Sequence, residues 1–164
     1  MESASGTRLR LRAARPDEAA RLSALALRSK AVWGYSRAFI EACRAELTFA
    51  PGDIARGGFV LAEDDARVVG FYALAQVVDG SAELEALFVE PEVIGRGIGR
   101  ALIEHAKARA ARCGARRLVI QGDPHAARFY AAAGGVEAGT RPSGSIAGRS
   151  LPLFVIELAA PPGR

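Results

Sequence analysis

The sequence has 164 residues, of which 50% are apolar and 24% are charged. This length suits one domain and is sufficient to bury a core without metal or disulfide staples. The net charge is +4, but Lys and Arg are spread along the chain rather than clustered. The excess charge therefore favours an anionic partner without indicating which one.

Several classes of protein are disfavoured by what the sequence lacks. Cys43 and Cys113 fit no metal-binding or CxxC spacing. No apolar run approaches membrane-spanning length, and the first seven residues lack the apolar segment of a signal peptide. No basic face studded with aromatic residues stands out. We therefore expect a cytoplasmic protein without metal, membrane or nucleic-acid partners.

The N-terminal third of the sequence predicts one strand followed by two helices. Leu and Arg alternate over residues 9–13, which predicts a strand with one buried face. Pro16, followed by two acidic residues, is typical of a helix start. A second helix is expected over 36–48 because its apolar residues recur at helical spacing, and Pro51 and Gly52 are expected to end it.

The middle of the sequence predicts three strands and a helix. Residues 59–62 and 68–76 are expected to be strands joined by a polar link, which is typical of a hairpin. Residues 84–89 are expected to be the third strand. A helix is expected over 97–112, and Gly114 is a suitable residue to end it.

The C-terminal part predicts a short strand over 118–120, a helix over 123–134, and two strands over 136–139 and 153–158. The helix begins at Asp-Pro, a typical cap followed by a first-turn proline. The whole order is β-α-α-β-β-β-α-β-α-β-β. This order predicts an α/β fold in which helices cover the faces of a mixed sheet.

One motif in the middle of the chain indicates chemistry. The strand over 84–89 is followed by a turn in which Gly95, Gly97 and Gly99 alternate with other residues, and a helix follows. Glycine lets the backbone approach a ligand closely, and the free N–H groups at a helix start bind anions. Arg96 and Arg100 add positive charge. The motif therefore predicts a phosphate-binding turn.

Two familiar phosphate-binding motifs fit this glycine turn poorly. A Walker loop needs a Lys that this turn lacks. A dinucleotide-binding turn needs a third Gly where Arg100 stands, and it belongs near the start of a βαβ unit. A glycine-rich turn that binds no ligand remains the simplest alternative.

Two segments resemble the GNAT superfamily of acyl-CoA N-acyltransferases. Residues 94–99, Ile-Gly-Arg-Gly-Ile-Gly, resemble its acyl-CoA signature Gln/Arg-x-x-Gly-x-Gly/Ala. Residues 123–130, Asp-Pro-His-Ala-Ala-Arg-Phe-Tyr, resemble its Asn-x-x-Ala-x-x-Phe-Tyr helix. The resemblance implies one domain over 8–159, between a flexible N-terminus (1–7) and a tail (160–164). It also implies a mostly antiparallel central sheet flanked by helices, with the acyl-CoA site at splayed central strands.

The resemblance further implies that acetyl-CoA is the co-substrate and that its acetyl group passes directly to an amine. In this sequence Ile94 stands where the family has Gln or Arg, and His125 stands where Asn often lies. The residues implied in binding the cofactor are Leu87, Phe88, Val89, Ile94, Gly95, Arg96, Gly97, Ile98, Gly99, Arg100, His125 and Arg128.

Amide formation needs a neutral amine, so a nearby carboxylate that accepts its proton would help. Glu83 and Glu85 lie two apart on one strand and therefore share a face, and Glu83 matches the position of a catalytic Glu in some family members. Tyr130 resembles the general acid that protonates the departing thiolate, whereas Phe129 is expected in the core. The alternatives are ordinary solvated carboxylates and a tyrosine at the edge of the core.

The acceptor is expected to be a small-molecule amine. Trp33 and Tyr35 lie between the first two helices, where this fold lines the acceptor pocket. The loop over 141–149 offers Ser143, Ser145 and Arg149, and Arg149 is suited to pair with a carboxylate on the substrate. Plain packing and a solvated surface loop are the alternatives. A protein amine, a non-catalytic CoA-binding module and a homodimer all remain open.

Overall fold

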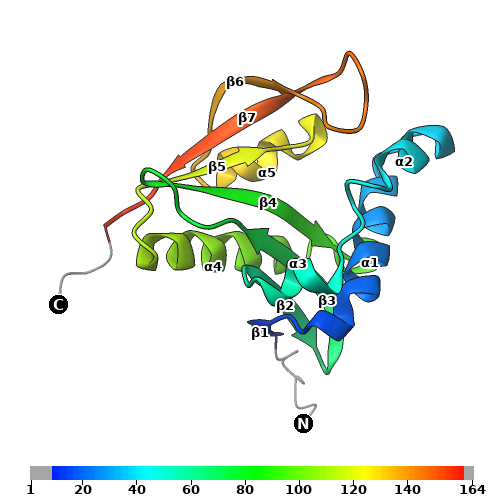
Figure 1. Ribbon diagram of the computed structural model, residues 1–164, viewed down its shortest axis with the longest axis horizontal. Coiled ribbons are helices and arrows are strands. Elements are labelled where there is room, and N and C mark those ends of the chain that lie inside the picture. Colours follow the sequence, from blue (N-terminus) through cyan, green and yellow to red (C-terminus); the bar gives the residue numbers. More distant parts are fainter. Residues whose placement is uncertain (1–8, 161–164) are drawn as a thin grey trace, which may run out of the picture.

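The computed structural model describes residues 9–160. Its strands form a single seven-stranded sheet (Figure 1). The strands follow one another across the sheet in the order β1-β2-β3-β4-β5-β7-β6. Only β4 and β5 run parallel, and every other neighbouring pair is antiparallel. The expected mixed, mostly antiparallel sheet is therefore confirmed. The strands are β1 (Leu9–Ala13), β2 (Phe59–Asp64), β3 (Arg67–Leu74), β4 (Ser81–Val89), β5 (Arg117–Gln121), β6 (Val136–Pro142) and β7 (Ser150–Glu157).

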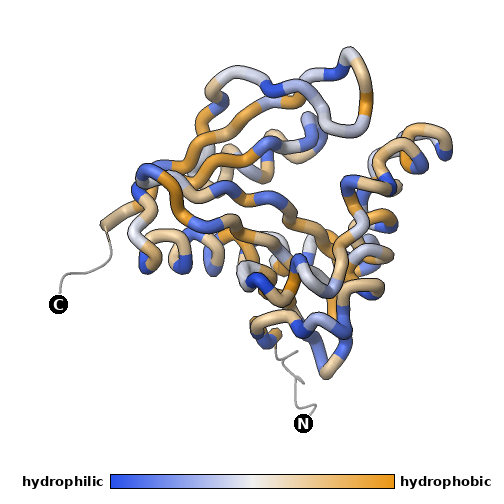
Figure 2. Tube along the Cα trace, in the orientation of Figure 1, coloured by the Kyte–Doolittle hydropathy of each residue, from blue (hydrophilic) through white to orange (hydrophobic). Residues whose placement is uncertain are grey.

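Helices cover both faces of this sheet, and each face has its own apolar core. One core packs α4 and α5 against the sheet, and the other packs α1, α2 and α3 against the opposite face. Apolar residues accordingly gather along the strands, while the outer side of α4 is polar (Figure 2). The helices are α1 (Ala19–Ala31), α2 (Arg37–Cys43), α3 (Pro51–Ala55), α4 (Ile98–Arg112) and α5 (Ala127–Ala132), with 3-10 turns η1 (Pro16–Glu18), η2 (Pro91–Val93) and η3 (Pro124–Ala126).

The strand β3 lies at the centre of both cores. Seven of its eight residues are buried, so it lacks the alternation of a strand with one solvated face. It joins β2 through the predicted hairpin, whose turn residues Asp65 and Ala66 have φ values of 48° and 66°. Positive φ at both central residues is typical of the tight turns that match the twist of paired strands.

The second helix and the segment after it differ from the sequence-based prediction. A helix was expected over 36–48, but α2 ends at Cys43, and the chain then turns so that Leu47 joins the core. Pro51 does not end a helix but begins α3, where its missing N–H costs nothing. The side chain of Asp53 accepts a hydrogen bond from the backbone of Ala50 at 2.8 Å and caps this short helix.

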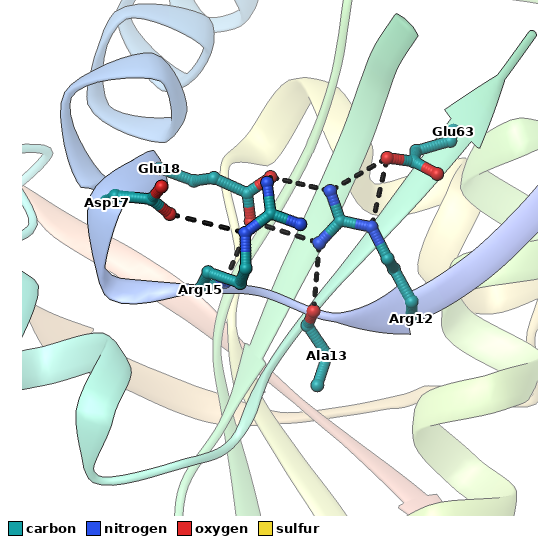
Figure 3. A network of polar contacts seen from close by, with 6 residues as sticks. All are labelled: Arg12, Ala13, Arg15, Asp17, Glu18 and Glu63. Atoms are coloured by element: carbon teal, nitrogen blue, oxygen red, sulfur yellow. Dashed lines mark hydrogen bonds and ion pairs between the residues drawn. The ribbon is translucent and has the colours of Figure 1, made fainter. Parts of the chain in front are cut away.

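A buried ion-pair network fixes β1 to the elements on either side of it (Figure 3). The guanidinium of Arg12 donates to Glu18 in η1 at 2.5 Å and to Glu63 on β2 at 2.7 Å. Glu18 is only 5% exposed, and it also accepts from the backbone N–H of Arg15. Hydrogen bonds from Arg12 are the largest cause that lowers the pKa of Glu18, so this carboxylate stays ionised when the protein is folded.

We expect Arg12→Met to lower the free energy of unfolding by about 2–3 kcal/mol at pH 7, because the buried carboxylate of Glu18 loses the guanidinium that donates to it and keeps only the exposed Arg15, at 3.3 Å. The control is Arg10→Met, which removes an exposed arginine from the same strand. Because the folded-state pKa of Glu18 is depressed, its contribution is complete above an ordinary glutamate pKa of about 4.3 and is lost progressively as the pH falls from there through the lower folded-state pKa. The free energies of unfolding of the wild type and of Arg12→Met, measured by urea denaturation, should therefore converge as the pH falls below about 4. Equal stability of the Arg12 and Arg10 variants at pH 7 would contradict this account.

Candidate functional site

The parallel strands β4 and β5 pair over only part of their length. Their register runs from Ser81 opposite Arg117 to Leu84 opposite Ile120 and ends there. Beyond this point β4 stays paired with β3 while β5 stays paired with β7, so the two strands part toward the side where α1 and α2 lie (Figure 1). A cavity of about 750 Å³ occupies the opening. The splayed central strands expected from the sequence are therefore present.

A bulge lies in β4 at the start of this opening. The register with β3 passes from Ala86 opposite Ala73 to Leu84 opposite Leu74, so Glu85 has no residue opposite it. A bulge of this kind bends the strand and redirects a side chain. In this protein it sets the direction of β4 where β4 leaves β5, and Glu85 lines the cavity.

The glycine turn joins β4 to α4 and forms one end of the cavity. Gly95 and Gly97 have φ values of 87° and 83°, a region that favours glycine. Gly97 precedes the first turn of α4, where the N–H groups of Ile98, Gly99 and Arg100 have no acceptor within the helix. These donors and the positive end of the helix dipole make the turn suitable for a phosphate group.

The third glycine of the turn serves packing. A Cβ atom at Gly99 would lie 3.2 Å from the ring of Phe129, so any larger residue would push α4 away from α5. Phe129, which was expected in the core, packs against it but is only half-buried, and it also lines the cavity beside this glycine. The small residue is needed at Gly99 because two helices approach each other closely there.

Two carboxylates on β4 face different surroundings. The Glu83 carboxylate accepts a hydrogen bond from Arg141 on β6 at 2.6 Å. The Glu85 carboxylate has no hydrogen bond or ion pair with any residue in the range 9–160. Desolvation, followed by the charges of Glu83 and Asp53, raises the pKa of Glu85. Of the two, Glu85 is the better proton acceptor because no cation holds its carboxylate.

Tyr130 on α5 lies deeper than Phe129, its neighbour in sequence. Its side chain is 6% exposed and packs against Phe154 with the ring centroids 5.3 Å apart, yet it also lines the cavity. Burial, with a smaller contribution from the charge of Asp123, raises the pKa of Tyr130 above its usual value. Its hydroxyl therefore stays protonated at neutral pH and is available as a donor.

A polar cluster not predicted from the sequence joins three elements at the cavity wall. Asp123, in front of η3, accepts hydrogen bonds from the Tyr35 hydroxyl at 2.8 Å and from Lys30 of α1 at 3.2 Å. Arg149 of the β6–β7 loop donates to the Tyr35 hydroxyl at 2.8 Å. We call these four residues the Asp123 cluster. Its ion pair between lysine and aspartate joins residues 93 positions apart, so no local pattern could have revealed it.

Asp123 caps the start of this helical segment, as the Asp-Pro sequence predicted. Its carboxylate accepts a hydrogen bond from the backbone N–H of His125 at 2.9 Å. The motif spacing also places Asp123, and not His125, at the Asn of Asn-x-x-Ala-x-x-Phe-Tyr, and this spacing was the signal for a role of Asp123 in the site. The His125 ring instead stacks on Trp33, with the centroids 5.3 Å apart and the planes 6° apart.

The β6–β7 loop closes one side of the cavity. It spans 143–149, shorter than predicted, because β6 continues until Pro142 pairs with Ser150. Ser145 donates a hydrogen bond to Glu46 in the link between α2 and α3, and Ile146 packs against the core beneath α1 and α2. The hydroxyl oxygen of Ser143 accepts from the backbone N–H groups of Ser145 and Ile146. Both predicted serines therefore already have partners within this wall.

Most of the residues singled out in the sequence meet around this one cavity, whereas Arg96, Arg128 and Tyr35 do not line it. No group of residues within 9–160 is arranged to hold a metal ion. No helix in the same range is long and apolar enough to cross a membrane. The predicted residues that do line the cavity are Trp33, Glu83, Glu85, Leu87, Phe88, Val89, Ile94, Gly95, Gly97, Ile98, Gly99, Arg100, His125, Tyr130, Ser143, Ser145 and Arg149.

Solved structures share this fold over nearly the whole chain. PaiA N-acetyltransferase from Thermoplasma acidophilum, in complex with coenzyme A, superposes with a TM-score of 0.77 at 20% identity, covering 92% of this chain and 99% of that one. A GCN5-related N-acetyltransferase from Rhodopseudomonas palustris gives 0.74 at 24% identity, covering 96% and 99%. YncA, a putative acetyltransferase from Salmonella typhimurium with acetyl-CoA, gives 0.67 at 18% identity, covering 96% and 98%.

No curated protein sequence matches the chain significantly, so the family assignment rests on a family model. The model of the acetyltransferase (GNAT) family matches residues 26–134, which is more than half of the chain. The matched range contains the splayed strands, the glycine turn and Tyr130. The chain therefore belongs to the GNAT acetyltransferase family, as the motifs in its sequence indicated.

Proposed function

We propose that this protein is an N-acetyltransferase that moves the acetyl group of acetyl-CoA directly to a primary amine on a small molecule. The observation that carries the proposal is the end of β4–β5 pairing at Leu84 and Ile120, which opens the cavity beside the glycine turn. In this proposal residues 8–159 form one catalytic domain. Membership of the family supports the reaction, and the geometry of the cavity supports the roles given below.

The glycine turn suits the pyrophosphate of acetyl-CoA. Nothing lies within 4 Å of the position that a Cβ would take at Gly95 or Gly97, so the backbone is open to a ligand there. Arg100 adds positive charge at the same end of the cavity. Because β5 has departed, the free edge of β4 over 85–89 can bond the amide groups of the pantetheine arm. Acetyl-CoA supplies an activated thioester carbon.

Glu85 is the proposed general base. A lysine-like amine has a pKa of about 10.4 and is protonated at pH 7, so it must lose a proton before it attacks. Glu85, directly or through water, accepts this proton from the ammonium group, and the neutral amine then forms the C–N bond to the acetyl carbon. The C–S bond breaks, and the second proton lost from nitrogen balances the proton that the CoA thiolate receives. The absence of a cation partner within residues 9–160 and the raised pKa of Glu85 both support this role.

Tyr130 is the proposed acid. The departing thiolate of CoA needs a proton or a strong hydrogen bond, and the hydroxyl of Tyr130 is protonated at neutral pH, since nothing in the described part of the chain lowers its pKa from the usual value. The side chain extends from α5 to line the same cavity as the residues of β4. Together the two residues allow transfer without a covalent enzyme intermediate.

The closed side of the cavity supports a small acceptor over a protein. The β6–β7 loop is held to the opposite wall by the Ser145–Glu46 and Arg149–Tyr35 hydrogen bonds and by the packing of Ile146. A folded protein substrate would need this wall to open. A thiol-release assay with acetyl-CoA and a panel of small amines and N-terminal peptides tests the proposal. No thiol release above the hydrolysis background with any amine would overturn it.

We expect Gly97→Glu to weaken acetyl-CoA binding at least tenfold in calorimetry. A side chain at this position would fill the space that the pyrophosphate needs, and the carboxylate would repel it. Gly114→Glu is the matched control, because Gly114 has a similar φ of 91° and open space but lies beyond the far end of α4. Equal affinity of the two variants would remove the glycine turn from the cofactor site.

Glu85→Gln should lower kcat by about 10²–10⁴-fold, the usual contribution of general acid–base catalysis. Desolvation raises the pKa of Glu85. In the wild type, kcat/KM should therefore fall on the acidic side of its pH profile with an apparent pKa above that of an ordinary glutamate. This acidic limb should be absent from the profile of Glu85→Gln. Glu83→Gln serves as the comparison and should keep that limb. If Glu83→Gln loses the limb and Glu85→Gln keeps it, the two roles are reversed.

Tyr130→Phe should lower kcat while leaving the affinity for acetyl-CoA unchanged, because the ring and its packing remain and only the hydroxyl is lost. Steady-state kinetics with a confirmed acceptor, together with calorimetry, separate the two quantities. Phe129→Leu is the control for disturbed packing next to this residue, and it should affect cofactor binding more than kcat. A Tyr130→Phe enzyme that works at the full rate would show that Tyr130 is not the acid.

A further inference from the structure

We propose that the acceptor carries a carboxylate next to its amine, as an α-amino acid does, and that Arg149 binds this carboxylate. This inference rests on the function proposed above and names the class of acceptor. It depends on how Arg149 is held at the cavity wall and on how little of its charge is neutralised there.

Arg149 is mostly withdrawn from solvent but poorly paired. Its side chain is 21% exposed and lines the cavity. The one hydrogen bond that its side chain makes within residues 9–160 goes to the neutral hydroxyl of Tyr35, and the nearest carboxylate oxygen, on Asp123, is 3.9 Å away. The guanidinium has five N–H donors, so most of them remain free for a ligand.

The charges of the Asp123 cluster do not cancel. Lys30 and Arg149 are both cationic, whereas Asp123 supplies a single negative charge and lies closer to Lys30, at 3.2 Å. The three side chains are 15%, 21% and 12% exposed. A cation held away from water at such a wall is costly unless an anion reaches it. The cluster therefore has one positive charge to offer to a ligand in the cavity.

The position of Arg149 is fixed before a ligand arrives. Its guanidinium lies over the rings of Tyr35 and Phe39, at 5.2 Å and 4.9 Å from their centroids, and such stacking restrains a long side chain. A planar guanidinium held in this way matches the two oxygens of a carboxylate. Because the guanidinium of Arg149 is held in place before a ligand arrives, it is suited to recognise a ligand carboxylate.

Other residues that line the same cavity fit the rest of such an acceptor. Glu85 has no protein partner within residues 9–160 and is available to the amine. Leu47, Phe49 and Leu151 are apolar and suit an apolar side chain. An acceptor with an amine, a carboxylate and an apolar group would use all three features. We therefore expect an apolar α-amino acid or a close analogue.

The phosphates of acetyl-CoA are a second source of negative charge, which Arg149 would meet only if the cofactor reached this wall. The glycine turn lies between β4 and α4, whereas Arg149 belongs to the β6–β7 loop and contacts the segment between α1 and α2. These are different elements of the cavity wall. Separate measurements of acceptor KM and acetyl-CoA affinity distinguish the two sources.

The first test compares matched acceptors in the thiol-release assay. Each apolar L-α-amino acid is assayed beside its carboxamide and its decarboxylated amine, which keep the amine and the side chain. The proposal expects kcat/KM to be at least tenfold higher for the acid than for either analogue. If the amide or the amine is acetylated equally well, the acceptor class is wrong while the N-acetyltransferase proposal survives. If no compound releases thiol, it is the proposed function that fails.

The second test changes the arginine. Arg149→Met keeps an unbranched apolar side chain without the charge. Arg149→Lys keeps the charge but loses the planar guanidinium. With the best acid from the panel, the acceptor KM should rise at least tenfold for Met and by less for Lys, while the calorimetric affinity for acetyl-CoA stays unchanged. Arg37→Met removes the same charge from an exposed position on the neighbouring helix α2 and should match the wild type. An unchanged acceptor KM in Arg149→Met, or a loss confined to acetyl-CoA affinity, would overturn the proposal.

Discussion

The parting of β4 from β5 is the constraint on which the rest of the site depends. Backbone N–H and C=O groups that leave a sheet ladder must find another partner, and the last residues of β4 can meet this demand only on their β3 side. Each departing strand keeps one neighbour, β3 for β4 and β7 for β5, so the opening is supported on both sides. The bulge at Glu85 directs β4 away from β5. A ligand with its own amide groups can therefore occupy the place of the missing strand.

The same opening gives two neighbouring carboxylates different electrostatic environments. Glu83 belongs to the part of β4 that is still paired with β5, and it reaches Arg141 on β6. Glu85 lies one step beyond that pairing, where desolvation and the charge of Glu83 raise its pKa. Two acids of one type thus acquire different properties from their position in the sheet. Their alternation along the strand predicted a shared face but not this division, which arises from the bulge and from a cation on a distant strand.

The sequence predicted best those features that are determined locally. Three such features are the glycine turn, the capped start at Asp123 and the polar hairpin link. Each needs a particular residue type at a particular backbone position, so each could be identified from the sequence alone. The second helix was extended too far because apolar spacing continued to Leu47 although the chain had already turned. The Lys30–Asp123 and Arg149–Tyr35 contacts join residues 93 and 114 positions apart. Their partners become neighbours only when the sheet has formed, so no spacing rule could have found them.

Tyr35 shows how these distant contacts act together although it does not line the cavity. Its hydroxyl donates to Asp123 and accepts from Arg149, so it connects the start of the α5 segment to the β6–β7 loop. Burial is the largest cause that raises the pKa of Tyr35, and a neutral hydroxyl can serve both partners at once. Asp123 is in turn held by its cap to His125, at the beginning of the segment that carries Tyr130. The positions of Arg149 and Tyr130 are therefore linked by one continuous chain of hydrogen bonds and helix geometry. If the two residues have the roles proposed above, a change on the Arg149 side of the cavity would also be felt at Tyr130.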